Sequence, residues 1–413
     1  MLALFKYNNR LKNIFNNHLY TLSLYVRRIA SAVVVFFLAR FLTLHDYGLY
    51  SSYSNIASLC LLVTNMGFNE YILVSTKNEL QKIKLEVTFF LIFALIVISI
   101  ILFFCPFIPL ENASIFSLVL LKVFFDNTFF ALILPYFQSA KQFNTIAKIN
   151  IFYGISIILI ALISYYIKLQ LQIFLILIVS LGIINFIQCS YFSKLKYTQV
   201  FTKYKTFLKL IDKSILYYIS VATIVFIKGQ LSSLYVSFVL PKEQTAIYFA
   251  SWNIATILSL VSIAQIQKLC PELINKKYIQ IQAIMHKNLK FIIFINLLIL
   301  VFFTLFGKYV LLIIYGSWEY TRAYPYLLVL TTCTLLSSIG MIFATYMTSQ
   351  GYQKYKSKLQ IEFLIFVSIV MLIFSRIGIW GAILTSLALE IYTCTRYFCF
   401  YIKNMKQLKI KDY

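Results

Sequence analysis

The sequence is poor in charge and especially in acidic residues. Only 12% of its 413 residues are charged, about half of what a soluble domain carries, whereas 61% are hydrophobic. The mean hydropathy is +0.84. This composition excludes an ordinary soluble domain and predicts a membrane protein. Because the whole chain holds only 13 Asp and Glu residues, it offers few carboxylates for catalysis.

The motifs of common catalytic and metal centres are also missing. We find no Gly-rich P-loop, no HExxH, no paired aspartates on a polar loop and no nucleophile elbow. The three histidines lie far apart, and the seven cysteines include no CxxC pair. We therefore predict no catalytic residue, no metal site and no bound cofactor, and we leave coupling to H+ or Na+ open.

Apolar segments follow one another along the entire chain. They run approximately over residues 20–42, 48–74, 87–109, 114–138, 146–167, 171–193, 214–240, 244–270, 288–314, 323–349, 358–376 and 378–401. At a rise of about 1.5 Å per residue, such segments are long enough to cross a bilayer. The sequence therefore predicts an all-α polytopic membrane protein with about twelve transmembrane helices. Pro135 and Pro325 fall inside two of the segments, where we expect kinks.

The basic residues lie on one side of this predicted topology. The formal net charge is +24, and nearly all loop lysines fall in every second loop and in the C-terminal tail. The positive-inside rule assigns those loops and both termini to the cytoplasm. This topology accounts for the charge without any nucleic-acid partner.

A stretch near the N-terminus recurs in the second half of the chain. Residues 40–57 return in degraded form at residues 244–255, at an offset of 198 positions, and each copy holds an Asn-Ile-Ala triplet. The longest and most basic connection, about 194–213, separates six predicted spans from six. We therefore predict a parallel internal repeat of two six-helix lobes, residues 1–200 and 201–413.

Three of the cations inside the apolar segments are candidate site residues. Lys228 is roughly 20 Å from either end of the seventh segment, too deep for its side chain to reach the surface. It should face a wet cavity, an acidic partner or an anionic ligand. Arg27 and Arg28 lie about 8 Å below the cytoplasmic surface, a depth from which arginine can snorkel to the headgroups. Adjacent helical residues diverge by about 100°, so both cannot face one cavity, and the sequence leaves open which one does.

The acids within the apolar segments allow several interpretations. Lys122 and Asp126 are four residues apart, so we expect a structural ion pair on one helix face. Glu70 and Glu390 are the other buried acids. Asp126, Glu70 and Glu390 are candidate counter-ions for a buried cation or carriers of a coupling H+ or Na+, and Glu70 alternatively lies near the surface.

The order of short motifs resembles one family of membrane proteins. In the first half, the matching residues are Arg40, Leu42, Asp46, Tyr47, Gly48 and Tyr50. In the second half, they are Pro271, Gly307, Tyr315, Gly316, Gln350, Gly351 and residues 378–382. Together they resemble the Wzx-type polysaccharide flippases of the multidrug, oligosaccharidyl-lipid and polysaccharide (MOP) exporter superfamily.

The resemblance implies a MATE-like fold and transport rather than an enzymatic activity. It implies that a polyprenyl-diphosphate-linked oligosaccharide, an O-antigen or capsular repeat unit, moves from the cytoplasmic to the outer face of the bacterial cytoplasmic (inner) membrane by alternating access. Such a role serves polysaccharide and lipopolysaccharide biosynthesis. In the family, a cationic cavity is thought to hold the diphosphate, which implies that Lys228, Arg27 and Arg28 bind substrate. Besides membrane lipids, the implied partners are a polysaccharide polymerase and a chain-length regulator.

Two other classes of function stay open at this point. A cation-coupled small-molecule exporter of the same superfamily has the same fold, although a cationic lumen argues against export of organic cations. A membrane glycosyltransferase or polymerase ordinarily needs a sizeable extramembrane loop to hold its site, and the predicted loops are short.

Overall fold

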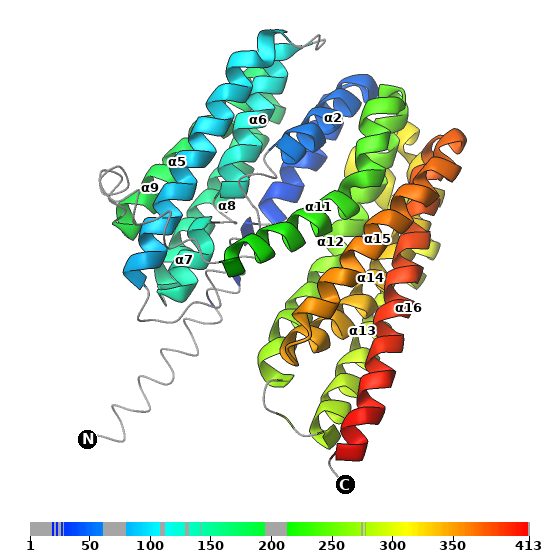
Figure 1. Ribbon diagram of the computed structural model, residues 1–413. Helices are drawn as coiled ribbons and strands as arrows, with labels where there is room; N and C mark the ends of the chain where they lie inside the picture. The colour runs from blue at the N-terminus through cyan, green and yellow to red at the C-terminus, as the bar shows by residue number, and fades with distance from the viewer. Residues whose placement is uncertain are drawn as a thin grey trace, which may run out of the picture. The chain divides into compact units, whose positions relative to one another are not determined.

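The computed structural model describes most of the chain as helix (Figure 1). The described residues are 29–60, 80–107, 112–128, 132–140, 142–194, 213–273 and 278–411, together with Leu19, Leu22, Ser23, Val26, Arg27 and Lys276. Every regular element in these ranges is an α-helix or a short 3-10 or π turn, and none is a strand. The predicted all-α class is confirmed.

The chain divides into two compact units. One comprises Met1–Thr43 and Tyr53–Thr223, and the other comprises Leu44–Ser52 and Ile224–Tyr413. The short stretch Leu44–Ser52, which belongs to the first copy of the sequence repeat, thus packs with the second unit. The predicted boundary at residue 200 and the parallel repeat stay predictions.

The first unit is a set of packed helices, of which α5, α8 and α9 are the longest. Beyond the helical residues 29–41, they are α2 (Leu44–Cys60, from Tyr53 onward), α5 (Leu80–Phe104), η2 (Cys105–Phe107), α6 (Ala113–Thr128), α7 (Leu134–Ser139), α8 (Phe143–Ile167) and α9 (Leu171–Ser193). Helix α9 packs against both α6 and α8. This arrangement brings polar side chains of α6 and α8 into the interior of the unit.

The second unit is built around α14. Its elements are α11 (Lys213–Val239, from Ile224 onward), α12 (Lys242–Leu273), α13 (Tyr278–Tyr315), η4 (Trp318–Ala323), α14 (Tyr324–Ser349), α15 (Gln353–Phe374), η5 (Ser375–Ile377) and α16 (Ile379–Lys411). Helix α14 packs against α12, α13 and α16, while α15 packs against α16. A core that includes Phe343, Tyr346 and Phe363 holds this unit together.

Six helices in the described ranges are long and apolar enough to cross a membrane. They are Glu86–Phe104, Phe143–Ile167, Leu171–Ser193, Tyr278–Tyr315, Trp318–Ser349 and Lys354–Ile377. Two shorter apolar helices are Ile29–Phe41 and Thr223–Val239. Several other predicted spans, including 48–74 and 114–138, lie partly outside the described residues.

The two prolines expected inside spans lie in the first turns of helices instead. Pro135 lies in the first turn of α7, after a π turn at residues 132–133, and residues 129–131 before it lie outside the described ranges. Pro325 lies in the first turn of α14, directly after η4. The kink predicted at Pro325 is therefore wrong, because a proline in a first turn removes no intrahelical hydrogen bond.

Candidate functional site

Arg27 is buried in the first unit and does not reach the surface. Its side chain is only 1% exposed. The guanidinium carbon lies 4.1 Å from the centroid of the Tyr153 ring on α8, and Nη1 donates to Oδ1 of Asn150 at 3.4 Å. The cation is thus held by the flat face of an aromatic ring and by a buried amide. The alternative of snorkelling to the headgroups does not describe Arg27.

Asp126 of α6 joins two cations and a tyrosine. Its Oδ1 lies 3.8 Å from Nη2 of Arg27 and accepts a hydrogen bond of 2.7 Å from the Tyr153 hydroxyl. Its Oδ2 accepts from Nζ of Lys122 at 3.4 Å, so the predicted i,i+4 pair is confirmed. We call Arg27, Lys122, Asp126, Asn150 and Tyr153 the Arg27 cluster. Its two cations share one carboxylate, so the cluster carries a net positive charge.

Local sequence explains why α8 can approach the helix that carries Arg27. A Cβ atom on Gly154 would lie 2.9 Å from Cγ1 of Val26 and 3.3 Å from its carbonyl oxygen, so glycine permits this close packing. Ser23 lies one turn before Arg27, and its Oγ accepts from Nδ2 of Asn150 at 3.4 Å. Asn150 of α8 is therefore hydrogen-bonded to both Arg27 and Ser23 across the helix interface.

Lys228 occupies a comparable but more open position in the second unit. It lies on α11 and remains partly exposed, with Nζ 5.2 Å from the centroid of the Phe363 ring on α15. The carboxylate of Glu390 attracts its ammonium group, and Lys356 repels it. No ion pair joins Lys228 to another part of the chain that the structure describes. We call Lys228, Lys356, Phe363 and Glu390 the Lys228 site.

Glu390 is oriented by hydroxyl groups of two helices. Thr393 on α16 donates to its Oε2 at 3.5 Å, and Ser337 on α14 donates to the same carboxylate. The hydroxyl of Ser386 donates to Oγ of Ser232 at 3.0 Å, which ties α16 to α11 near Lys228. The structure thus brings together two residues that the sequence had nominated separately, Lys228 and Glu390.

The remaining predicted site residues, Arg28 and Glu70, lie outside the described residues. The sequence did not nominate Tyr153, Phe363 or Ser337. Nothing distinguishes one ring among 31 tyrosines and 39 phenylalanines, and a single serine in an apolar helix carries no signal either.

The two copies of the sequence repeat meet inside the second unit. Tyr47 is fully buried, and its hydroxyl accepts a hydrogen bond of 3.0 Å from Nδ2 of Asn253. The Tyr47 ring also packs at 6.0 Å from that of Tyr320. A Cβ atom on Gly48 would lie 1.8 Å from the carbonyl oxygen of Lys242, so only glycine allows this approach. The Tyr-Gly pair of the motif thus anchors the start of α2 on α12.

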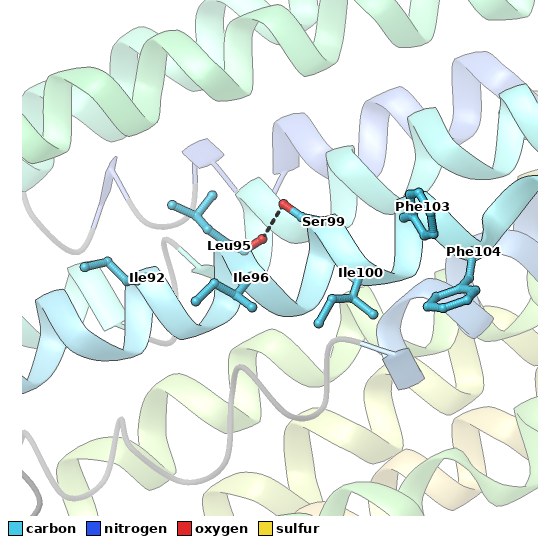
Figure 2. Close-up of a pocket in the computed structure, with 7 residues that line it drawn as sticks. All are labelled: Ile92, Leu95, Ile96, Ser99, Ile100, Phe103 and Phe104. Carbon is cyan, nitrogen blue, oxygen red and sulfur yellow. Dashed lines mark hydrogen bonds between the residues drawn. The ribbon is translucent and has the colours of Figure 1, made fainter.

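A surface groove on α5 has a different character (Figure 2). Its lining side chains are Ile92, Leu95, Ile96, Ser99, Ile100, Phe103 and Phe104. The Ser99 hydroxyl, its one polar side-chain group, donates to the Leu95 carbonyl at 2.8 Å. Without a charged group, this groove suits hydrocarbon and does not provide a site for a charged ligand.

Solved structures of transporters share this fold. An inward-facing multidrug resistance MATE transporter of the MOP superfamily superposes with a TM-score of 0.71 at 13% identity, covering 93% of this chain and 95% of the other. The lipid II flippase MurJ, in an inward closed conformation, gives a TM-score of 0.69 at 14% identity, covering 95% and 90%. The predicted MATE-like fold is confirmed. A search of curated proteins finds no significant sequence match.

A family model supplies the sequence evidence that these distant structures lack. The model described as "Polysaccharide biosynthesis protein" matches residues 37–321, more than half of the chain, including Lys228, Asp126 and the Tyr47-Gly48 pair. With its apolar helices and its transporter fold, the protein is a multi-pass membrane protein. The chain belongs to the polysaccharide biosynthesis protein family, as the resemblance to the MOP exporter superfamily led us to expect.

Proposed function

We propose that this protein is a flippase for a polyprenyl-diphosphate-linked oligosaccharide. It moves the lipid-linked unit from the cytoplasmic to the outer face of the bacterial cytoplasmic membrane by alternating access. The family match to polysaccharide biosynthesis and the MOP fold support a transporter in this pathway. The observation that carries the proposal is Lys228, an ammonium group within an apolar helix that is partly exposed and has no ion pair among the described residues.

The chemistry of a diphosphate matches this site. Ammonium and guanidinium groups bind phosphate oxygens through strong charge-assisted hydrogen bonds. In the Lys228 site, Lys228 is attracted by the one carboxylate of Glu390 and repelled by Lys356, so two cations accompany a single carboxylate and one positive charge is left for an anionic headgroup. The Arg27 cluster has the same surplus, with Arg27 and Lys122 facing Asp126. The hydrocarbon tail of the substrate remains in the bilayer.

The direct test is to find where the lipid-linked unit collects in cells that lack this protein. We expect a completed unit to accumulate on the inner leaflet, and the wild-type gene to clear it. Absence of the completed unit would instead indicate an enzyme of its synthesis. Normal transfer of the unit to the outer face would point to export of another molecule, as in the small-molecule exporters with this fold.

We assign coupling to H+ or Na+ to Glu390 rather than Asp126. Both carboxylate oxygens of Asp126 accept hydrogen bonds, from Lys122 and from Tyr153, and Arg27 lies near them, so they are less available to a coupling ion. Among the described residues, Glu390 has hydroxyl donors and the more distant Lys228 as its partners, so a small cation competes for it more easily. Glu390→Gln in proteoliposomes should abolish the dependence of flipping on a proton or sodium gradient, with Asp126→Asn as the comparison. Unchanged gradient dependence in Glu390→Gln would remove this assignment.

A further inference from the structure

A second charged group lies on α15 and α16, away from Lys228. The Glu362 carboxylate accepts a hydrogen bond of 2.8 Å from Nη2 of Arg396 and another from the Tyr392 hydroxyl. These side chains are not buried, since Arg396 is 40% exposed and Glu362 is 36% exposed. The ring of Tyr392 stacks on Phe366, which fixes its hydroxyl toward the carboxylate. Glu362 therefore positions the guanidinium at the surface of the unit.

The two helices bring further cations to the same face. They run side by side in opposite directions, as the pairs Tyr352–Asn404 and Glu362–Arg396 show (Figure 1). Lys358 lies one turn from Glu362, and Lys403 lies two turns from Arg396, so both share the face of the ion pair. Both lysines are exposed, as is Lys354 one turn further along α15. We call Lys354, Lys358, Glu362, Arg396 and Lys403 the Arg396 surface.

Depth along the helices places this surface at the edge of the membrane. Helix α16 has 33 residues, about 50 Å at 1.5 Å each, which exceeds a hydrocarbon core of about 30 Å. Its lysine-rich end therefore leaves the bilayer, on the side that the positive-inside rule assigns to the cytoplasm. Arg396 lies about 10 Å below Lys403, within the reach of a snorkelling arginine. The neighbouring Ile361 and Ile365 are exposed apolar residues, as expected for a face in contact with lipid.

We propose that the Arg396 surface binds the headgroup of an anionic phospholipid from the cytoplasmic leaflet. The Arg396 surface holds four cations and one carboxylate, and the surplus positive charge lies where phosphate groups begin. The lysines at the helix ends would by themselves indicate only how the helices are oriented in the membrane. Arg396 is different, because a charged pair exposed within an apolar stretch is costly in lipid unless a ligand or water meets it. The stacked rings of Tyr355 and Phe400 lie beside this charge and offer a flat apolar contact for the upper part of an acyl chain.

The test is lipid retention by the purified full-length protein, measured by native mass spectrometry. The probes are phosphatidylglycerol and phosphatidylcholine with the same acyl chains. We expect the wild type to prefer phosphatidylglycerol and Arg396→Gln to bind it about fivefold more weakly. Arg376→Gln, which removes an exposed cation at the opposite end of α15, should bind as the wild type does. Equal binding of the two lipids by the wild type, or unchanged binding by Arg396→Gln, would overturn the proposal.

Two further variants separate binding from folding and from the substrate. Glu362→Gln keeps an oxygen acceptor for Arg396 but removes the opposing charge, so we expect tighter binding of phosphatidylglycerol, which a purely structural pair would not give. If Arg396→Gln does not fold, the double variant Lys358→Gln, Lys403→Gln carries the test, with a loss of roughly thirtyfold. Displacement of phosphatidylglycerol by a polyprenyl diphosphate, lost in that double variant, would assign this surface to the transported lipid and contradict us.

Discussion

The Arg27 cluster and the Lys228 site each combine a cation, an aromatic ring and a carboxylate, but they differ in burial and in hydrogen bonding. In each, a cation on an apolar helix lies over an aromatic ring and near a carboxylate. Arg27 is buried and bound by Asn150 and Asp126, whereas Lys228 is partly exposed and meets Glu390 only at longer range. Both are cations on apolar helices, and they differ in the number of protein groups that bind them.

The largest effect is expected from Arg27→Ala. This change leaves Asn150 without its donor and removes one of the two cations beside Asp126. Breaking a buried ion pair costs about 3–5 kcal/mol, so we expect a large loss of folded protein. Thermal unfolding followed by fluorescence-detected size exclusion measures it, and the exposed Arg376→Ala serves as control. Wild-type stability of Arg27→Ala would show that this cluster is not structural.

Lys228→Ala should reduce export and leave the amount of folded protein unchanged. Because no described ion pair depends on Lys228, we expect normal protein levels and a loss of export. Lys228→Arg should retain part of the export, since a cation rather than a shape is required. Accumulation of lipid-linked oligosaccharide in complemented cells provides the measurement. Equal activity of Lys228→Ala and the wild type would make Lys228 a tolerated structural residue.

Tyr153→Phe tests the bond between the ring and the carboxylate. The substitution keeps the aromatic face under Arg27 but removes the hydroxyl that donates to Asp126. Hydrogen bonds to charged groups contribute about 1.5–3 kcal/mol, so stability should fall less than in Arg27→Ala. The same thermal unfolding assay applies. A loss as large as that of Arg27→Ala would mean that Tyr153, rather than the arginine, organises the cluster.

Of these variants, Phe363→Leu should have the smallest effect, a modest loss of flipping activity. It removes the ring below the Lys228 ammonium while keeping an apolar side chain of similar reach. A cation–π contact at a partly exposed position contributes about 0.5–1 kcal/mol, so we expect at most a fivefold loss of flipping in proteoliposomes. Since Phe363 is also fully buried in the core, Val367→Leu on the same helix provides a packing control. A complete loss specific to Phe363→Leu would contradict the view that charge dominates this site.

Local patterns predicted the parts of these sites that lie within one helix. The Lys122–Asp126 pair followed from a spacing of four residues. Lys228, Glu390 and Asp126 were recognised because a charge in an apolar segment is costly wherever the helix packs. The link between Arg27 and Asp126 was not predicted, because 99 positions separate them and nothing in either helix specifies its neighbour. The placement of Pro325 was missed for a similar reason, since hydropathy alone does not set the first residue of a helix.

The sequence by itself determined the membrane class, the helical fold and the positions of the costly charges. Each follows from hydropathy and spacing, which act over one or two helical turns. Only the tertiary structure decided which protein groups bind each charge. The Gly154 contact lets α8 reach Arg27 and bring Asn150 and Tyr153 to it, whereas Lys228 meets a carboxylate already held by Ser337 and Thr393. The physical reason is distance: electrostatic compensation acts over a few ångströms, between helices that are far apart in sequence.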